Sequence, residues 1–227
     1  MDLTFFKNHY SYFENEGYFQ KYLGKECVDN GFIAGELGYD LEGAFLFALR
    51  KDYLFPIWQQ VDVYSEEDVF DVIEFLYDHC AKPTKRSYHD WNGCGWHCEE
   101  YDELAGKKEF REKINKILEL YSEGFELSSS GEVLALAETG LEGLFEAPIP
   151  TADPENIEKR IEAAKIKWRR HRATWDDRKE AIRELADVLE YLRPQLKKVL
   201  ETEDENDLFN IANNFGIRHH NQKQKIN

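Results

Sequence analysis

The chain has 227 residues, 42% of them hydrophobic and 14% aromatic, which is enough for a folded core in one large domain or two small ones. Its net charge of −16 argues against a broad nucleic-acid-binding surface, and no apolar run approaches the roughly 20 residues that span a bilayer. The N-terminus lacks the features of a signal peptide, so we expect a cytoplasmic protein with no membrane association, whose four cysteines stay thiols.

Residues 1–150 predict a helical N-terminal domain that contains a small β-hairpin. Its clearest helix follows the capping box Ser65-Glu-Glu-Asp68 and carries apolar residues at helical spacing. Further helices are predicted over residues 41–54 and around residues 110–121. Two short apolar runs on either side of a serine- and glycine-containing turn predict the hairpin near residues 124–137.

Residues 86–104 lack a helical or alternating pattern. Two glycines and several aromatic residues predict an ordered, irregular loop, which is packed by Trp91 and Trp96.

Cysteine and histidine side chains in and near this loop could hold zinc. The candidate ligands are Cys94, His97 and Cys98, with Cys80 or His89. Their spacing is not a recognised paired arrangement, so our prediction for the chain includes no metal site and no cofactor. A thiol nucleophile at Cys94 with His97 is a weaker alternative, because the surrounding residues match no cysteine-protease signature.

A proline-rich segment at residues 147–154 predicts a linker and a boundary to a second domain, residues 151–227. Three helices are expected there, the first running from Pro154 to about Arg172. The second begins at Thr174 and carries a 3–4-spaced apolar seam that is typical of helical bundles, with a kink or break near Arg193 caused by the following proline. The third begins at the capping box Thr202-Glu-Asp-Glu205. The chain is therefore expected to be mainly α, within the α+β class.

The third predicted helix changes character along its length. Its apolar face is formed by four residues at helical spacing, Leu208, Ile211, Ala212 and Phe215. A polar stripe beside that face contains Asn214 and Arg218, and His219 and His220 follow. Arginine can bind a phosphate through two hydrogen bonds and histidine can transfer protons near neutral pH, so this group suits metal-independent cleavage of a phosphodiester. Alternatively, these cations pair with acidic helices of the same bundle, or lie on a solvated end.

Basic residues gather in two C-terminal segments of this acidic chain. The candidate RNA-contacting residues are Lys165, Lys167, Arg169, Arg170, Arg172 and Lys223. For the residues before Lys223, the alternative is a helix end at which cations offset the negative pole of the helix dipole.

Ile217-Arg218-His219, together with the earlier residues 110–127 and Gly131-Glu-Val133, is similar to a known family. The C-terminal domain resembles a HEPN domain, a small helical bundle found in RNA-cleaving toxins and phage-defence proteins. Arg218 aligns with the arginine of the family motif and His219 with the polar residue that follows it. The earlier segment resembles the helix and hairpin that precede such domains in abortive-infection proteins, and the resemblance covers residues 105–227.

The resemblance implies a defence or toxin protein that cleaves RNA as a homodimer without a metal or cofactor. Arg218 would contact the scissile phosphate, His219 or His220 would act as acid or base, and Asn214 would orient them. The alternative is a non-catalytic HEPN-like binding or dimerisation module of a defence complex, favoured because Lys223 and its neighbours stand where the family has a further histidine. A bundle of this kind would add another helix, so we expect an incomplete chain or a partner that completes the fold.

Overall fold

The computed structural model describes residues 3–121, 124–137 and 140–214, without the side chains of residues 142, 146, 213 and 214. It divides the chain into two compact units, Met1–Leu136 and Ala137–Asn227, so the division falls before the proline-rich segment. Helices predominate, and the described strands form three two-stranded antiparallel sheets. The predicted mainly α, α+β class is confirmed. Among the described residues, no helix combines the length and apolar character needed to cross a bilayer.

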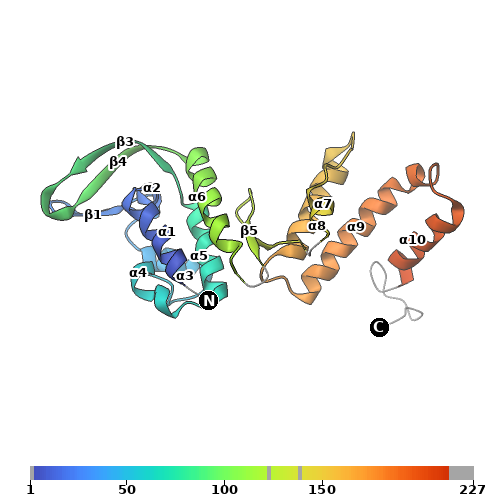
Figure 1. Cartoon of the computed structure of the whole chain (residues 1–227), viewed down its shortest axis with the longest axis horizontal. Helices are drawn as coiled ribbons and strands as arrows, with labels where there is room; N and C mark the ends of the chain where they lie inside the picture. The colour runs from blue at the N-terminus through green and yellow to red at the C-terminus, as the bar shows by residue number, and fades with distance from the viewer. Residues whose placement is uncertain (1–2, 122–123, 138–139, 215–227) are drawn as a thin grey trace. The chain divides into compact units, whose positions relative to one another are not determined.

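Unit 1 combines helices with all three hairpins (Figure 1). Its elements are α1 (Thr4–Asn15), α2 (Gln20–Leu23), β1 (Lys25–Cys27), β2 (Gly31–Ile33), α3 (Leu41–Leu49), α4 (Ile57–Gln60), η1 (Val61–Val63), α5 (Glu66–Asp78), β3 (Lys82–His89), η2 (Trp91–Gly93), β4 (Gly95–Asp102), α6 (Glu103–Leu118), β5 (Phe125–Leu127) and β6 (Val133–Ala135). β1 pairs with β2, β3 with β4, and β5 with β6. The predicted hairpin near residues 124–137 is thereby confirmed.

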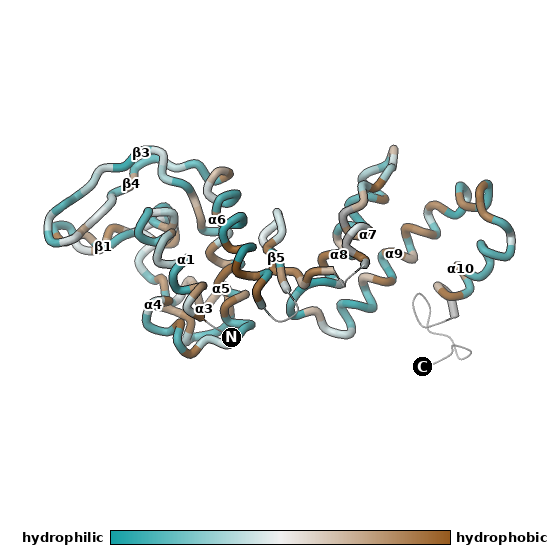
Figure 2. Tube along the Cα trace, viewed as in Figure 1, coloured by the Kyte–Doolittle hydropathy of each residue, from teal (hydrophilic) through white to brown (hydrophobic). Residues whose placement is uncertain are grey.

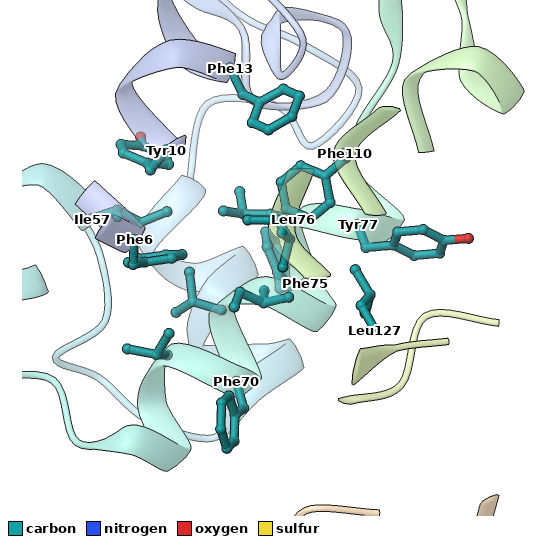
Figure 3. Close-up of a cluster of buried hydrophobic side chains, with 14 of the residues drawn as sticks. Phe6, Tyr10, Phe13, Ile57, Phe70, Phe75, Leu76, Tyr77, Phe110 and Leu127 are labelled. Atoms are coloured by element: carbon teal, nitrogen blue, oxygen red, sulfur yellow. The ribbon is translucent and has the colours of Figure 1, made fainter. Parts of the chain in front are cut away.

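Helix α5 lies at the centre of the hydrophobic core of unit 1 (Figure 3). The predicted capping box at its start is present, with Ser65 accepting from the backbone N–H of Asp68. Its apolar residues are buried among aromatic side chains from α1 and α6, and the rings of Phe13 and Phe110 lie 4.9 Å apart. Burying each large apolar side chain stabilises the fold by about 1.5–3 kcal/mol. Figure 2 shows the hydrophobic stretch along α5.

Residues 82–102 form a hairpin, so the predicted irregular loop was wrong. β3 and β4 pair antiparallel, with His89 opposite Gly95. Most side chains of the hairpin are exposed or half-buried, so no alternating hydrophobic pattern marks the strands. The positive φ angles of Asn92 and Gly93 turn the chain between them. The ring of Trp96 packs against Tyr88, as expected for an aromatic residue here, whereas Trp91 is 69% exposed.

Unit 2 is helical in its described residues. Its elements are α7 (Glu142–Glu146), η3 (Pro154–Glu158), α8 (Lys159–Arg169), α9 (Trp175–Leu196) and α10 (Thr202–Asn214). A capping box begins α9, with Thr174 accepting from the backbone N–H of Asp177. α9 continues through Pro194 to Leu196, so the helix does not end at the predicted position near Arg193.

The buried face of α10 differs from the predicted one. Phe209 and Ala212 are buried, whereas Ile211 is 55% exposed. The guanidinium of Arg193 lies 4.2 Å from the ring centre of Phe209 and donates to the buried carboxylate of Glu205 at 2.6 Å. These two contacts hold the Phe209 side of the helix against α9. They involve an ion pair across two helices, which the apolar spacing of α10 alone does not reveal.

Candidate metal centre

Four side chains of unit 1 converge where β1 lies beside the tip of the β3–β4 hairpin (Figure 1). Cys27, His89, Cys94 and His97 each offer one ligand atom, and these atoms all lie within 4.8 Å of one another. Cys94 Sγ is 3.1 Å from Nε2 of His97. Donor atoms around a tetrahedral zinc ion are separated by roughly 3.3–3.8 Å, as its bond lengths require. Any two of these atoms therefore need to approach by about 1.5 Å at most to coordinate zinc.

Two hairpins position these side chains. Cys27 is the last residue of β1, and the turn that follows leads into β2. His89 ends β3, and Cys94 and His97 follow on the other side of the hairpin turn. Because Gly95 adopts a positive φ of 83°, the chain can bend sharply between the last two residues. A metal here would join the β1–β2 hairpin to the β3–β4 hairpin.

The protonation states of the cluster suit a metal. Backbone N–H groups of Asp29 and Asn30 lower the pKa of the Cys27 thiol to about 7, so thiolate is available at neutral pH. Burial, with the nearby charges of Lys25 and His89, lowers the pKa of His97 and favours the neutral imidazole. Thiolate and neutral imidazole are the forms that bind zinc.

Two neighbouring groups stabilise the arrangement of the ligands. The Asp29 carboxylate lies 3.3 Å from Nε2 of His89. A carboxylate on one ring nitrogen fixes the orientation of a metal-binding histidine and makes the other nitrogen more basic. The ammonium group of Lys25 donates to the backbone carbonyl of Cys94 at 2.6 Å and so ties the hairpin tip to β1.

The structure gathers only some of the zinc ligands considered from the sequence. Cys94, His97 and His89 come together, but Cys80 is fully buried in the core, where burial raises the pKa of its thiol. Cys98 lies outside the cluster. The fourth ligand, Cys27, was missed because it belongs to a distant hairpin and no local spacing links it to the others.

The predicted catalytic residues fall at the end of the chain. Asn214 is the last residue of α10, and its side chain is not among those described. Arg218, His219, His220 and Lys223 lie outside the described residues. The predicted catalytic group therefore stays a prediction.

The basic segment around α8 makes contacts within unit 2. Lys165 donates to the carbonyl of Phe145 and to Glu162, both at 2.7 Å. Lys167 lies 3.5 Å from Glu180, and the guanidinium of Arg169 stacks over the ring of Phe145. Arg170 and Arg172 follow the end of α8. RNA contact by this segment also stays a prediction.

Comparisons with protein-family models, curated proteins and solved structures find no match. Functional inference therefore depends on the geometry of the site itself.

Proposed function

We propose that unit 1 is a zinc-binding module with one site of two cysteines and two histidines. The observation that carries the proposal is the convergence of Cys27, His89, Cys94 and His97, whose ligand atoms all lie within 4.8 Å of one another. Two thiolates and two imidazoles are a common donor set for zinc in proteins.

The site is structural rather than catalytic. Four protein ligands complete the tetrahedron, whereas a catalytic zinc keeps one position for water or substrate. The β3–β4 hairpin has few buried side chains of its own, so a metal at its tip replaces the hydrophobic contacts that the strands lack. Structural zinc contributes to folding directly, with apparent binding free energies of about 10–16 kcal/mol in small zinc-binding peptides.

A thiol nucleophile is the competing interpretation of the same residues. Cys94 Sγ and His97 Nε2, at 3.1 Å, are within reach of a nucleophile and its base. That chemistry requires neither a second thiol nor a second imidazole at the same point, yet Cys27 and His89 are both there. The complete set of four favours zinc.

Cobalt substitution tests the zinc proposal. We expect the full chain to bind one equivalent of Co²⁺ with the visible absorption of a tetrahedral thiolate site, and zinc to displace it. Cys27→Ser should weaken this spectrum and the zinc affinity, while Cys98→Ser, in the same strand as His97 but outside the cluster, should leave both unchanged. Equal effects of the two substitutions would overturn the proposed ligand set.

We propose as a second candidate function that the C-terminal segment is a HEPN-type, metal-independent endoribonuclease of a phage-defence system. The stripe of Asn214 and Arg218 beside His219 supports it, because these side chains suit phosphodiester cleavage. A non-catalytic HEPN-like module that binds a partner or forms a homodimer is the alternative.

Labelled RNA separates these two alternatives. RNA is incubated with the protein in EDTA, beside Arg218→Ala and His219→Ala variants. Cleavage that either substitution abolishes supports the ribonuclease. Cleavage that survives both rejects the assignment, and its absence in every form favours the binding module. Zinc content and thermal stability of the same preparations, measured before EDTA is added, show whether a loss of activity instead reflects a damaged unit 1.

A further inference from the structure

A cavity of 1110 Å³ lies beside the metal centre in unit 1 and includes Cys94 in its wall. Residues from α1, α2, β1, β2, α3 and α4 line it together with the tip of the β3–β4 hairpin. Aromatic rings are prominent in the lining, including those of Tyr10, Phe32, Tyr39, Trp58, Tyr88 and Trp96. Three of them are unusually exposed for aromatic side chains, at 80% for Tyr39, 65% for Trp58 and 56% for Tyr88. Aromatic rings held in water beside a cavity are available to a ligand.

Acidic side chains give this cavity its charge. Five carboxylates line it, those of Glu14, Glu16, Glu26, Asp40 and Glu42, against the single cation Lys25. The cavity therefore attracts positive charge and repels phosphate groups.

The carboxylates differ in how far the protein already satisfies them. Glu16 pairs with Arg86 at 2.8 Å, and Asp40 accepts from the backbone N–H of Gly43 at the start of α3. Glu26 and Glu42 have no ion-pair partner within the part of the chain that the structure describes. Burial raises the pKa of Glu14, which accepts from the Tyr10 hydroxyl at 2.7 Å. A cationic ligand would thus meet unpaired carboxylates as well as aromatic faces.

We propose that this cavity binds a lysine- or arginine-containing peptide segment of a protein partner. Ammonium and guanidinium groups bind carboxylates and also the faces of aromatic rings, the two kinds of group that the lining supplies. The volume exceeds the roughly 300–1,000 Å³ of pockets for single small molecules, so it accommodates several residues of a peptide. Carboxylates from α1, β1 and α3 provide partners for more than one cation along such a peptide.

The proposed peptide site rests on the proposed zinc site only in part, because the cavity and the zinc site share one wall. Cys94 belongs to both, and Lys25 connects its carbonyl to β1. Loss of the metal would move this wall, whereas α1, α3 and α4 would keep the opposite side. Zinc content is therefore measured for each variant, so that a failed peptide site and a failed metal site are distinguished.

Fluorescence anisotropy with the full-length, zinc-loaded protein tests the proposal. The probe is a short labelled peptide of alternating lysine, arginine and alanine, and its counterpart carries glutamate in place of the cations. We expect binding of the basic peptide only, weaker at higher salt because charged contacts contribute. Trp58→Ala and the double variant Glu26→Gln/Glu42→Gln should each lower the affinity about tenfold, with zinc content unchanged.

Matched substitutions in unit 2 serve as controls. Trp175→Ala removes a similarly exposed tryptophan and the double variant Glu201→Gln/Glu203→Gln removes two exposed carboxylates, and neither change should alter peptide affinity. Equal losses of peptide affinity in the control and cavity variants would mean that the peptide binds through the overall negative charge of the protein. That result would overturn the proposal. Absence of binding by the zinc-loaded protein would also overturn it. Spermidine that binds as tightly as the peptide would identify a small polyamine as the ligand instead.

Discussion

Cys94 and His97 meet at the tip of a hairpin, with Sγ 3.1 Å from Nε2. Two residues separate them in the sequence, yet they lie on either side of the start of β4, and the positive φ of Gly95 bends the chain between them. The pair supplies half of the proposed zinc site. Cys27 and His89 supply the other half from two different strands, so the site can form only when both hairpins are in place.

Removing the metal should destabilise unit 1, because the proposed zinc would link the β1–β2 hairpin to the β3–β4 hairpin. We expect chelation, or His89→Ala, to lower the melting temperature of the unit by roughly 10 °C, corresponding to about 3 kcal/mol. Differential scanning calorimetry of the full chain measures the effect. His9→Ala is the control, since His9 lies outside the cluster of four and its ring nitrogen contacts the Phe5 carbonyl of its own helix at 2.9 Å. An unchanged transition after complete zinc removal would contradict a structural role.

Cysteine alkylation should distinguish a zinc site from a nucleophile. In the zinc-loaded protein we expect iodoacetamide to modify Cys27 and Cys94 slowly, because coordination blocks both sulfur atoms. After chelation Cys94 should react faster than Cys27 and Cys80, because Cys94 is half-buried whereas the other two thiols are buried, and burial also raises the pKa of Cys80. Mass spectrometry of peptides over time gives each rate. Rapid alkylation of Cys94 with zinc present would instead support the nucleophile.

The sequence predicts elements whose signals are local. The capping box at Ser65 and the apolar face of α5 lie within one segment, and both were predicted correctly. The β3–β4 hairpin was missed because its side chains are mostly polar and exposed, which leaves no hydrophobic alternation to recognise. Cys27 was missed for a different reason. Its relation to His97 exists only in three dimensions, since it depends on how two hairpins pack.

Asp29 should tune the metal site without binding the metal. Its carboxylate lies 3.3 Å from Nε2 of His89, so Asp29→Asn removes a charge that orients the ring. We expect zinc affinity to fall about 10- to 100-fold, with one metal still bound per chain. Competition with a chromophoric chelator measures the affinity. Asp52→Asn, at an exposed aspartate on another loop, controls for the loss of one negative charge. If Asp29→Asn instead lowers the number of zinc ions bound per chain, Asp29 is itself a ligand.

Zinc affinity should fall as the pH falls, because protons compete with the metal for thiolate. The folded chain lowers the pKa of Cys27 from 9.0 to about 7. The thiolate of Cys27 therefore stabilises the metal-free fold fully above about pH 9, and this contribution is lost as the pH falls to about 7. The lowered pKa of His97 also makes the metal-free fold less stable as the pH falls, since protonation of the His97 ring favours the unfolded chain.

With zinc present, we expect an affinity that decreases at least about tenfold per pH unit below pH 7, since at least one proton must leave before the metal binds. Chelator competition between pH 8 and pH 6 measures the slope. Cys27→Ser should flatten it, because a serine hydroxyl does not titrate in this range, whereas Cys98→Ser should leave it unchanged. A slope that is the same in all three proteins would show that Cys27 does not coordinate the zinc.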